Sequence, residues 1–362
     1  MEPLRIANPH DLAADKGVQK TAIEDLTSQH RDIFSRAVAN VLSSEIAQIT
    51  YAQIADGLPL SSVEMDTYGY GALSGDHPLH TKHTSLCPGA LEKAQELHAE
   101  FNPNSLQLLY EYQAASPGSR AFQTRLIELI AVAIHQMAVW IVKLDVSLHK
   151  DDGIATWEPP KDDATFWIRN PNGPPPTLFQ HTFYRDYDQY PEGVADGVGY
   201  WAEARILGGV VLFDRRDAKF NPSVELKTLP RIDPNAVYFH ADRQGTTYRI
   251  YQLLDSQKEQ LLDYLLLEKT PPAFCPLPIL ATNDNRRRVD PEEHITDTGI
   301  YRDIWERKPP PWDELDFRIK DVMDELDYPT MDDWDASHRR GYEKKEEMYS
   351  RFDEDPGREQ QK

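Results

Sequence analysis

The chain has 362 residues, of which 60 are acidic and 39 basic, and its formal net charge is −21 at pH 7. Affinity for a nucleic-acid backbone comes mainly from Lys and Arg that displace counterions, so this charge argues against general nucleic-acid binding. The same charge would be repelled by an anionic membrane surface. The only cysteines are Cys87 and Cys275, which excludes a disulfide framework and is typical of a reducing compartment.

The first 20 residues contain no apolar segment of the kind found in signal peptides, and we expect them to be flexible. Leu126–Lys143 is the one apolar stretch long enough to suggest a membrane span, but it includes Glu128, His135 and Lys143. A charge near the bilayer centre costs about 2.5–3.5 kcal/mol, so we expect no membrane insertion. The sequence therefore predicts a soluble cytoplasmic protein, or a nuclear one if Arg286–Arg288 serves import.

The first part of the chain carries helical patterns. Apolar residues recur at helical spacing behind a capping box at Thr21–Glu24, which predicts a helix to about Ala55 that ends near Gly57. An irregular segment is expected over Ser61–Pro88. Further helices are predicted over Ala90–Glu100, Ser105–Ala114 and Arg120–His149.

The helix predicted over Arg120–His149 is apolar on most of its circumference. Its polar residues fall in one stripe about 100° wide when plotted at helical spacing; they are Arg125, Glu128, His135, Gln136 and Lys143. This pattern predicts a core helix with one solvated edge, packed against a sheet.

After a proline-rich linker, the pattern changes to strands. Strands are predicted over Leu178–Tyr187, Tyr200–Glu203 and Ile206–Asp214, and a hairpin over Val237–Ala241 and Thr246–Tyr251. A second capping box, Ser256–Glu259, predicts a helix packed on this sheet.

Together these elements predict an α+β fold in which a helical N-terminal portion packs on a central antiparallel sheet. We expect one domain over 21–270, with helices in 21–150 and the sheet and closing helix in 178–268. Residues 271–362 are expected to form a proline-rich and then acidic, partly extended C-terminal region.

The strongest candidate site is a histidine cluster. His77, His80 and His83 lie within seven residues, and Cys87 follows four residues later. Imidazole and thiolate are natural ligands of zinc, so these side chains are candidate metal ligands for Zn or Fe. The spacing matches no established metal motif, and a polar surface loop is the alternative interpretation.

Other chemistry-bearing sets are weaker. His181, His240 and Asp186 could form an iron-binding triad on the sheet, although the usual His-x-Asp spacing is missing. Glu128 and His135 could form a buried acid–base pair. Four acidic residues could supply glycosidase carboxylates; they are Asp196, Glu203, Asp214 and Asp217. Phosphate-binding, kinase and nucleophile-elbow motifs are absent from the sequence.

Three segments carry a resemblance to other proteins. The three segments are GYWAEARILGGVVLFDR (Gly199–Arg215), AVYFHADRQGTTYRIYQLLDSQ (Ala236–Gln257) and KEQLLDYLL (Lys258–Leu266). They resemble segments of a group of uncharacterised proteins of filamentous fungi. The resemblance covers roughly Phe179–Leu267. It implies a soluble fungal protein and assigns no activity, cofactor or site residue.

The sequence favours a non-enzymatic binding or accessory protein that acts through contacts with another protein. Trp305, Trp312 and Trp334 lie among acidic residues, a pattern that suits either a docking motif or a strap packed on its own domain. The alternative is a metal-dependent enzyme, of the hydrolase or non-haem iron oxygenase type, that uses the clustered histidines. A pocket lined by Tyr200, Trp201, Tyr238 and Phe239 is a third possibility.

Overall fold

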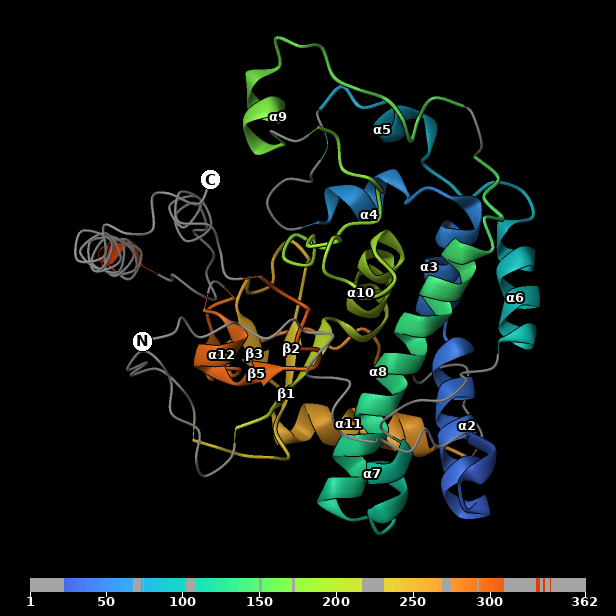
Figure 1. Cartoon of the computed structure of the whole chain (residues 1–362), viewed down its shortest axis with the longest axis vertical. Helices are drawn as coiled ribbons and strands as arrows, with labels where there is room; N and C mark the ends of the chain where they lie inside the picture. Colours follow the sequence, from blue (N-terminus) through green and yellow to red (C-terminus); the bar gives the residue numbers. More distant parts are fainter. Residues whose placement is uncertain are drawn as a thin grey trace, which may run out of the picture.

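The computed structural model describes residues 23–67, 73, 75–101, 109–149, 152–170, 173–216, 231–268, 275–291, 293–308, 330–332, 335 and 339. Within them the chain is an α+β protein in which helices pack beside a five-stranded antiparallel sheet (Figure 1). The helices are η1 (Ile23–Asp25), α2 (Ser28–Leu42), α3 (Glu45–Asp56), α4 (Ser61–Met65), α5 (Leu79–Lys82), α6 (Ala90–Glu100), α7 (Leu109–Ala114), α8 (Arg120–Lys143), α9 (Ala164–Arg169), α10 (Val194–Leu207), α11 (Asp255–Leu266) and α12 (Ile295–Thr298).

The sheet has the strand order β4-β3-β2-β1-β5, and each neighbouring pair is antiparallel. Its strands are β1 (Val210–Asp214), β2 (Val237–His240), β3 (Ile250–Gln252), β4 (Arg288–Val289) and β5 (Ile300–Tyr301). Both edge strands come from the region after residue 270, so this part of the chain completes the sheet. The sequence also predicts a short amphipathic helix over Asp313–Asp327 in the acidic region, and these residues lie outside the described ones.

Alternation along β1 separates the two apolar clusters that border this strand. Val211 and Phe213 belong to the large cluster shared with the helices, whereas Val210 and Leu212 belong to a smaller cluster on the opposite side of the strand. This division follows from the two-residue period of a strand. The smaller cluster is rich in tyrosine, and Trp305 packs against it. Both faces of the sheet are therefore buried.

The N-terminal helices follow the predicted pattern with one interruption. The helix expected to run to about Ala55 is divided into α2 and α3 at Ser43 and Ser44. The Ser44 side chain caps α3 by accepting a hydrogen bond from the Ala47 N–H. Serine in this position favours a helix start because its hydroxyl replaces a missing intrahelical partner. α6 coincides with the predicted Ala90–Glu100.

α10 is a helix where strands were predicted over Tyr200–Glu203 and the start of Ile206–Asp214. It is buried on all sides, and a short apolar run of this kind cannot be assigned to helix or strand from periodicity alone. Gly208, with φ of +109°, ends the helix and leads into β1. The segment predicted as a strand over Leu178–Tyr187 forms no strand, because it folds into turns.

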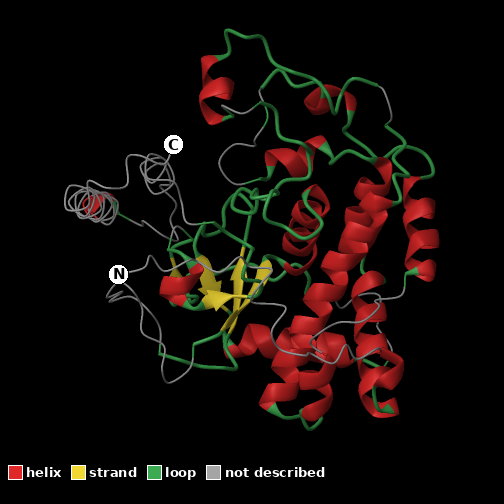
Figure 2. Ribbon diagram, in the orientation of Figure 1, coloured by secondary structure: helices red, strands yellow, loops and turns green. Residues whose placement is uncertain are grey.

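α8 packs along α10, which lies between it and the sheet in Figure 1. Figure 2 shows the same division between helices and strands. Alone among the described helices, α8 has the length and hydropathy to cross a membrane, but 72% of its most apolar window is buried, as in a core helix. The expected solvated edge is wrong for Glu128 and His135, which are buried.

Candidate metal centre

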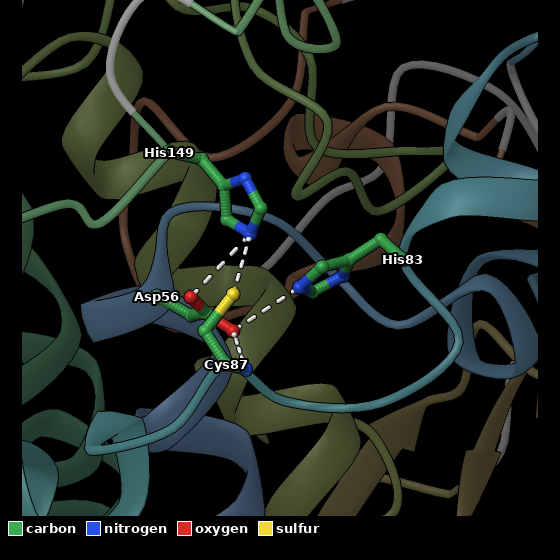
Figure 3. Close-up of side chains that lie close together, drawn as sticks. All are labelled: Asp56, His83, Cys87 and His149. Carbon is green, nitrogen blue, oxygen red and sulfur yellow. Dashed lines mark hydrogen bonds and ion pairs between the residues drawn. The ribbon is translucent and has the colours of Figure 1, made fainter.

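Four side chains from separate segments converge at one end of the helical layer (Figure 3). Asp56 is the last residue of α3, and His83 follows α5 directly. Cys87 precedes α6, and His149 lies beyond the end of α8. One ligand atom from each residue lies within 4.8 Å of the others, and this is the one such group found among the described residues.

The end of α3 is built to receive the segment that carries His149. Gly57 takes the left-handed conformation, with φ of +100°, and ends the helix. A Cβ atom on Gly57 would lie only 1.8 Å from Ser147 Oγ, so glycine is needed for this close approach. The Asp56 carbonyl accepts hydrogen bonds from the N–H groups of Leu148 (3.0 Å) and His149 (3.2 Å).

Both imidazoles present Nε2 to the centre of the cluster. His83 Nδ1 lies 2.9 Å from the Pro59 carbonyl, which can only accept, so Nδ1 carries the proton. His149 Nδ1 lies 2.5 Å from Asp152 Oδ2 and donates to it in the same way. A carboxylate or carbonyl partner on the far ring nitrogen is the usual second-shell arrangement of metal-binding histidine.

The inward-facing atoms are mostly acceptors. His83 Nε2 is 3.1 Å from Asp56 Oδ2, and His149 Nε2 is 3.5 Å from Asp56 Oδ1. With Nδ1 already protonated, a neutral His83 has only a lone pair to present to the carboxylate. Asp56 Oδ1 is buried without a hydrogen-bond donor. A proton or a metal cation between these atoms is therefore required to relieve the repulsion.

The thiol of Cys87 completes the group at 3.1 Å from His149 Nε2. Burial, together with the neighbouring Asp56 carboxylate, raises the pKa of this thiol. Burial also acts to raise the pKa of Asp152, but the hydrogen bonds from the Ile154 N–H and His149 outweigh it and lower that pKa. Without a cation, the centre therefore favours the neutral thiol of Cys87 over the thiolate. A bound cation would favour the thiolate instead.

The donor set fits zinc. Tetrahedral zinc with bonds of about 2.0–2.3 Å places its ligand atoms about 3.3–3.6 Å apart. His83 Nε2 to Asp56 Oδ2 and Cys87 Sγ to His149 Nε2 are both 3.1 Å, close to these values, and one donor atom from each of the four residues lies within 4.8 Å of the others. Asp56 and His83 are 0% and 1% exposed, whereas Cys87 and His149 are half-buried. Small side-chain movements would bring all four donors to bonding distance.

The structure brings one of the three predicted histidine ligands into this group. His83 joins the centre together with Cys87, but His77 and His80 do not. His77 Nδ1 accepts a hydrogen bond from the Leu79 N–H, and burial lowers the pKa of His77 to about 4. His80 Nδ1 lies 3.7 Å from Glu64.

The proposed iron triad is not assembled. The rings of His181 and His240 are adjacent, at 5.1 Å between centroids, but each directs Nε2 at a backbone carbonyl. Burial lowers the pKa of both residues. Asp186 instead accepts a hydrogen bond from the Lys308 N–H. These histidines therefore pack the interior in their neutral form.

The other predicted acids belong to a buried ionic network between α8, α10 and the segment after β5. His135 lies between two carboxylates, with Nε2 at 3.0 Å from Asp196 and Nδ1 at 3.8 Å from Glu203. Burial acts to lower the pKa of His135, but the hydrogen bond with Asp196 and the nearby Glu203 carboxylate raise it. Arg302 binds both oxygens of Glu203, at 2.8 and 2.7 Å.

Glu128 is not the partner of His135, because it pairs with Arg125 and Arg215. Asp214 pairs with Arg216 at 2.7 Å, and Asp217 lies outside the described residues. The three of these acids that the structure describes, Asp196, Glu203 and Asp214, therefore pair with buried basic side chains and do not form a pair of glycosidase carboxylates. The four aromatic residues proposed as a pocket lining are buried in the interior.

Sequence reasoning missed Asp56 and His149. Both lie at the predicted ends of long helices, where a polar residue is usually explained by exposure to solvent. The available signals were Asp56 beside the helix-ending Gly57, and the His149-x-x-Asp152 spacing, which places a carboxylate within reach of the ring.

No family model, no curated protein and no solved structure matches the chain in the comparisons with known proteins.

Proposed function

We propose that this protein binds one zinc ion through Asp56, His83, Cys87 and His149, and that the ion stabilises the fold. The observation that carries the proposal is the convergence of four suitable donors from separate segments, with both histidines held by partners on Nδ1. Four protein ligands fill a tetrahedral shell, which is typical of structural zinc sites, whereas catalytic sites keep a position for water.

The choice of zinc rests on the ligand types. A thiolate disfavours Mg²⁺ and Ca²⁺, which prefer oxygen ligands. Two histidines and one carboxylate also occur in non-haem iron sites, but those sites keep open positions for oxygen and substrate. In this protein a cysteine supplies a fourth donor beside the two histidines and the carboxylate.

A structural ion supports the expectation of a non-enzymatic binding or accessory protein. We propose that its partner is another protein and that the acidic C-terminal region contributes to the contact. Trp305 packs against the protein's own aromatic cluster, so it supports the strap interpretation at that position. Trp312 and Trp334 lie outside the described residues.

The metal proposal is tested by elemental analysis of protein purified under reducing conditions. We expect about one zinc per chain, lost from His149→Ala. His80→Ala is the matched control, because His80 belongs to the predicted histidine cluster but not to the centre, and it should retain the metal. Circular dichroism would show whether each variant is folded. Folded wild-type protein without zinc, or zinc retained by folded His149→Ala, would refute the proposal.

A second candidate function is a cysteine nucleophile. Cys87, His149 and Asp152 form a continuous chain of hydrogen bonds, which is the arrangement of nucleophile, base and orienting acid in cysteine hydrolases. The raised pKa of Cys87 counts against this role, because the thiolate is the reactive form.

The two candidates differ in the reactivity of the metal-free thiol. We expect iodoacetamide to alkylate Cys87 with an apparent pKa above the ordinary value of about 8.5. Mass spectrometry separates this reaction from that of the exposed Cys275. Alkylation that is already complete at neutral pH, with an apparent pKa below that of Cys275, would favour the nucleophile.

A further inference from the structure

The four ligands of the candidate zinc centre are not equally protected. Asp56 and His83 are sealed in the interior, whereas Cys87 and His149 are partly exposed. Cys87 is also the only thiol among the ligands. The most readily oxidised donor therefore lies on the solvent side of the centre.

We propose that Cys87 is a redox modification site whose oxidation by a hydroperoxide releases the metal. This inference rests on the proposed zinc function. The bound ion holds Cys87 as the thiolate that attacks peroxides, and it does so despite the neighbouring Asp56 carboxylate.

The reaction is Cys–S⁻ + ROOH + H⁺ → Cys–SOH + ROH. A sulfur lone pair attacks the terminal peroxide oxygen, so an S–O bond forms as the O–O bond breaks. Sulfur is oxidised and the peroxide is reduced. The leaving alkoxide takes a proton from water, because the one proton of a zinc-bound His149 lies on Nδ1 and is donated to Asp152. The product is a neutral sulfenic acid, which an added thiol can reduce.

Loss of the thiolate removes one of the two negative charges that face the ion. The centre then keeps one carboxylate and two imidazoles, of which His149 is partly open to water. Zinc affinity falls because a thiolate is a strong ligand for this ion and a sulfenic acid is a weak one. Zinc then leaves by the exposed side of the centre.

Metal release has a structural consequence. Without the metal, Asp56 Oδ2 and His83 Nε2, which lie 3.1 Å apart, need a proton between them in its place. Three segments meet at this point: the end of α3, the loop before α6 and the segment after α8. The metal no longer joins these segments, so the oxidation state of one thiol is coupled to the packing of the helical layer.

The test uses the full-length protein loaded with zinc and a colorimetric zinc chelator. Hydrogen peroxide in excess is expected to release all of the bound zinc, and dithiothreitol with added zinc is expected to restore it. Dimedone, which labels sulfenic acid, should mark Cys87 in step with the release. Cys275→Ser is the matched control, because it removes the other thiol and should release zinc as the wild type does.

Cys87→Asp keeps a negatively charged ligand that peroxide does not oxidise, so its zinc should stay bound. Zinc retained by the wild type in peroxide, or release that depends on Cys275, would overturn the inference and leave the zinc site standing. A chain that takes up no zinc would overturn the proposed function and this inference together.

Discussion

Substitution of Arg302 would measure how much the buried ionic network contributes to the free energy of unfolding. The Arg302 guanidinium is 3% exposed and forms two hydrogen bonds, of 2.8 and 2.7 Å, with Glu203, which is 0% exposed. Arg302→Met removes the cation, keeps much of the volume and leaves Glu203 buried with only the Val211 N–H and the more distant His135. Breaking a buried pair from one side costs about 3–5 kcal/mol.

Urea denaturation followed by circular dichroism measures this loss in the free energy of unfolding. Lys308→Met is the matched control, because Lys308 pairs with Asp188 at the surface and exposed pairs contribute about 0–1 kcal/mol. The double variant Arg302→Met/Glu203→Gln should lose less than the sum of its single variants, since it no longer leaves a charged Glu203 without Arg302, while the loss of the Arg302–Asp303 pair is common to both Arg302 variants. An Arg302→Met protein within 1 kcal/mol of the wild type would refute the argument.

Two further predictions concern the contact between α8 and α10. Because the pKa of His135 is raised by Asp196 and Glu203, its contribution to stability should be complete below the unfolded pKa of about 6.5. That contribution should be lost as the pH rises through the folded pKa, and His135→Gln should flatten this decline in urea titrations carried out from about pH 6.5 upward. Gly199→Ala should lower the free energy of unfolding by about 1–3 kcal/mol, because the added Cβ would lie 2.6 Å from the His135 ring. Gly75→Ala meets no atom within 4 Å and should change stability little; equal effects of the two substitutions would contradict the packing argument.

The fold class followed from the sequence because periodicity and capping are local properties. The Ala90–Glu100 helix and the pairing of β2 with β3 could be predicted in this way. α10 could not, since its run of apolar and small residues is buried on every side. The helix periodicity that would have identified it is therefore missing.

The polar stripe of α8 shows a second limit of prediction from a single sequence. Glu128 and His135 occupy one edge of the helix, as predicted, but these two side chains meet charged partners and not water. A single sequence does not show whether a polar stripe faces solvent or another polar stripe. The partners come from residues far away in the chain, such as Arg215 and Asp196.

The candidate centre was visible only in part for the same reason. His83 and Cys87 are four residues apart and could be suspected together. Asp56 lies 31 residues before Cys87, and His149 lies 62 residues after it. Only the packing of α3 against the segment after α8 brings them together, and that packing depends on Gly57.

The late position of β5 has a consequence for synthesis of the protein on the ribosome. β1 pairs with β2 soon after both have been translated, but its other edge stays open until residues near 300 emerge. Through that interval a nascent chain presents an unpaired, apolar strand edge, which is the kind of surface that chaperones bind. We therefore expect chains stalled before β5 to need chaperone protection more than chains stalled after it.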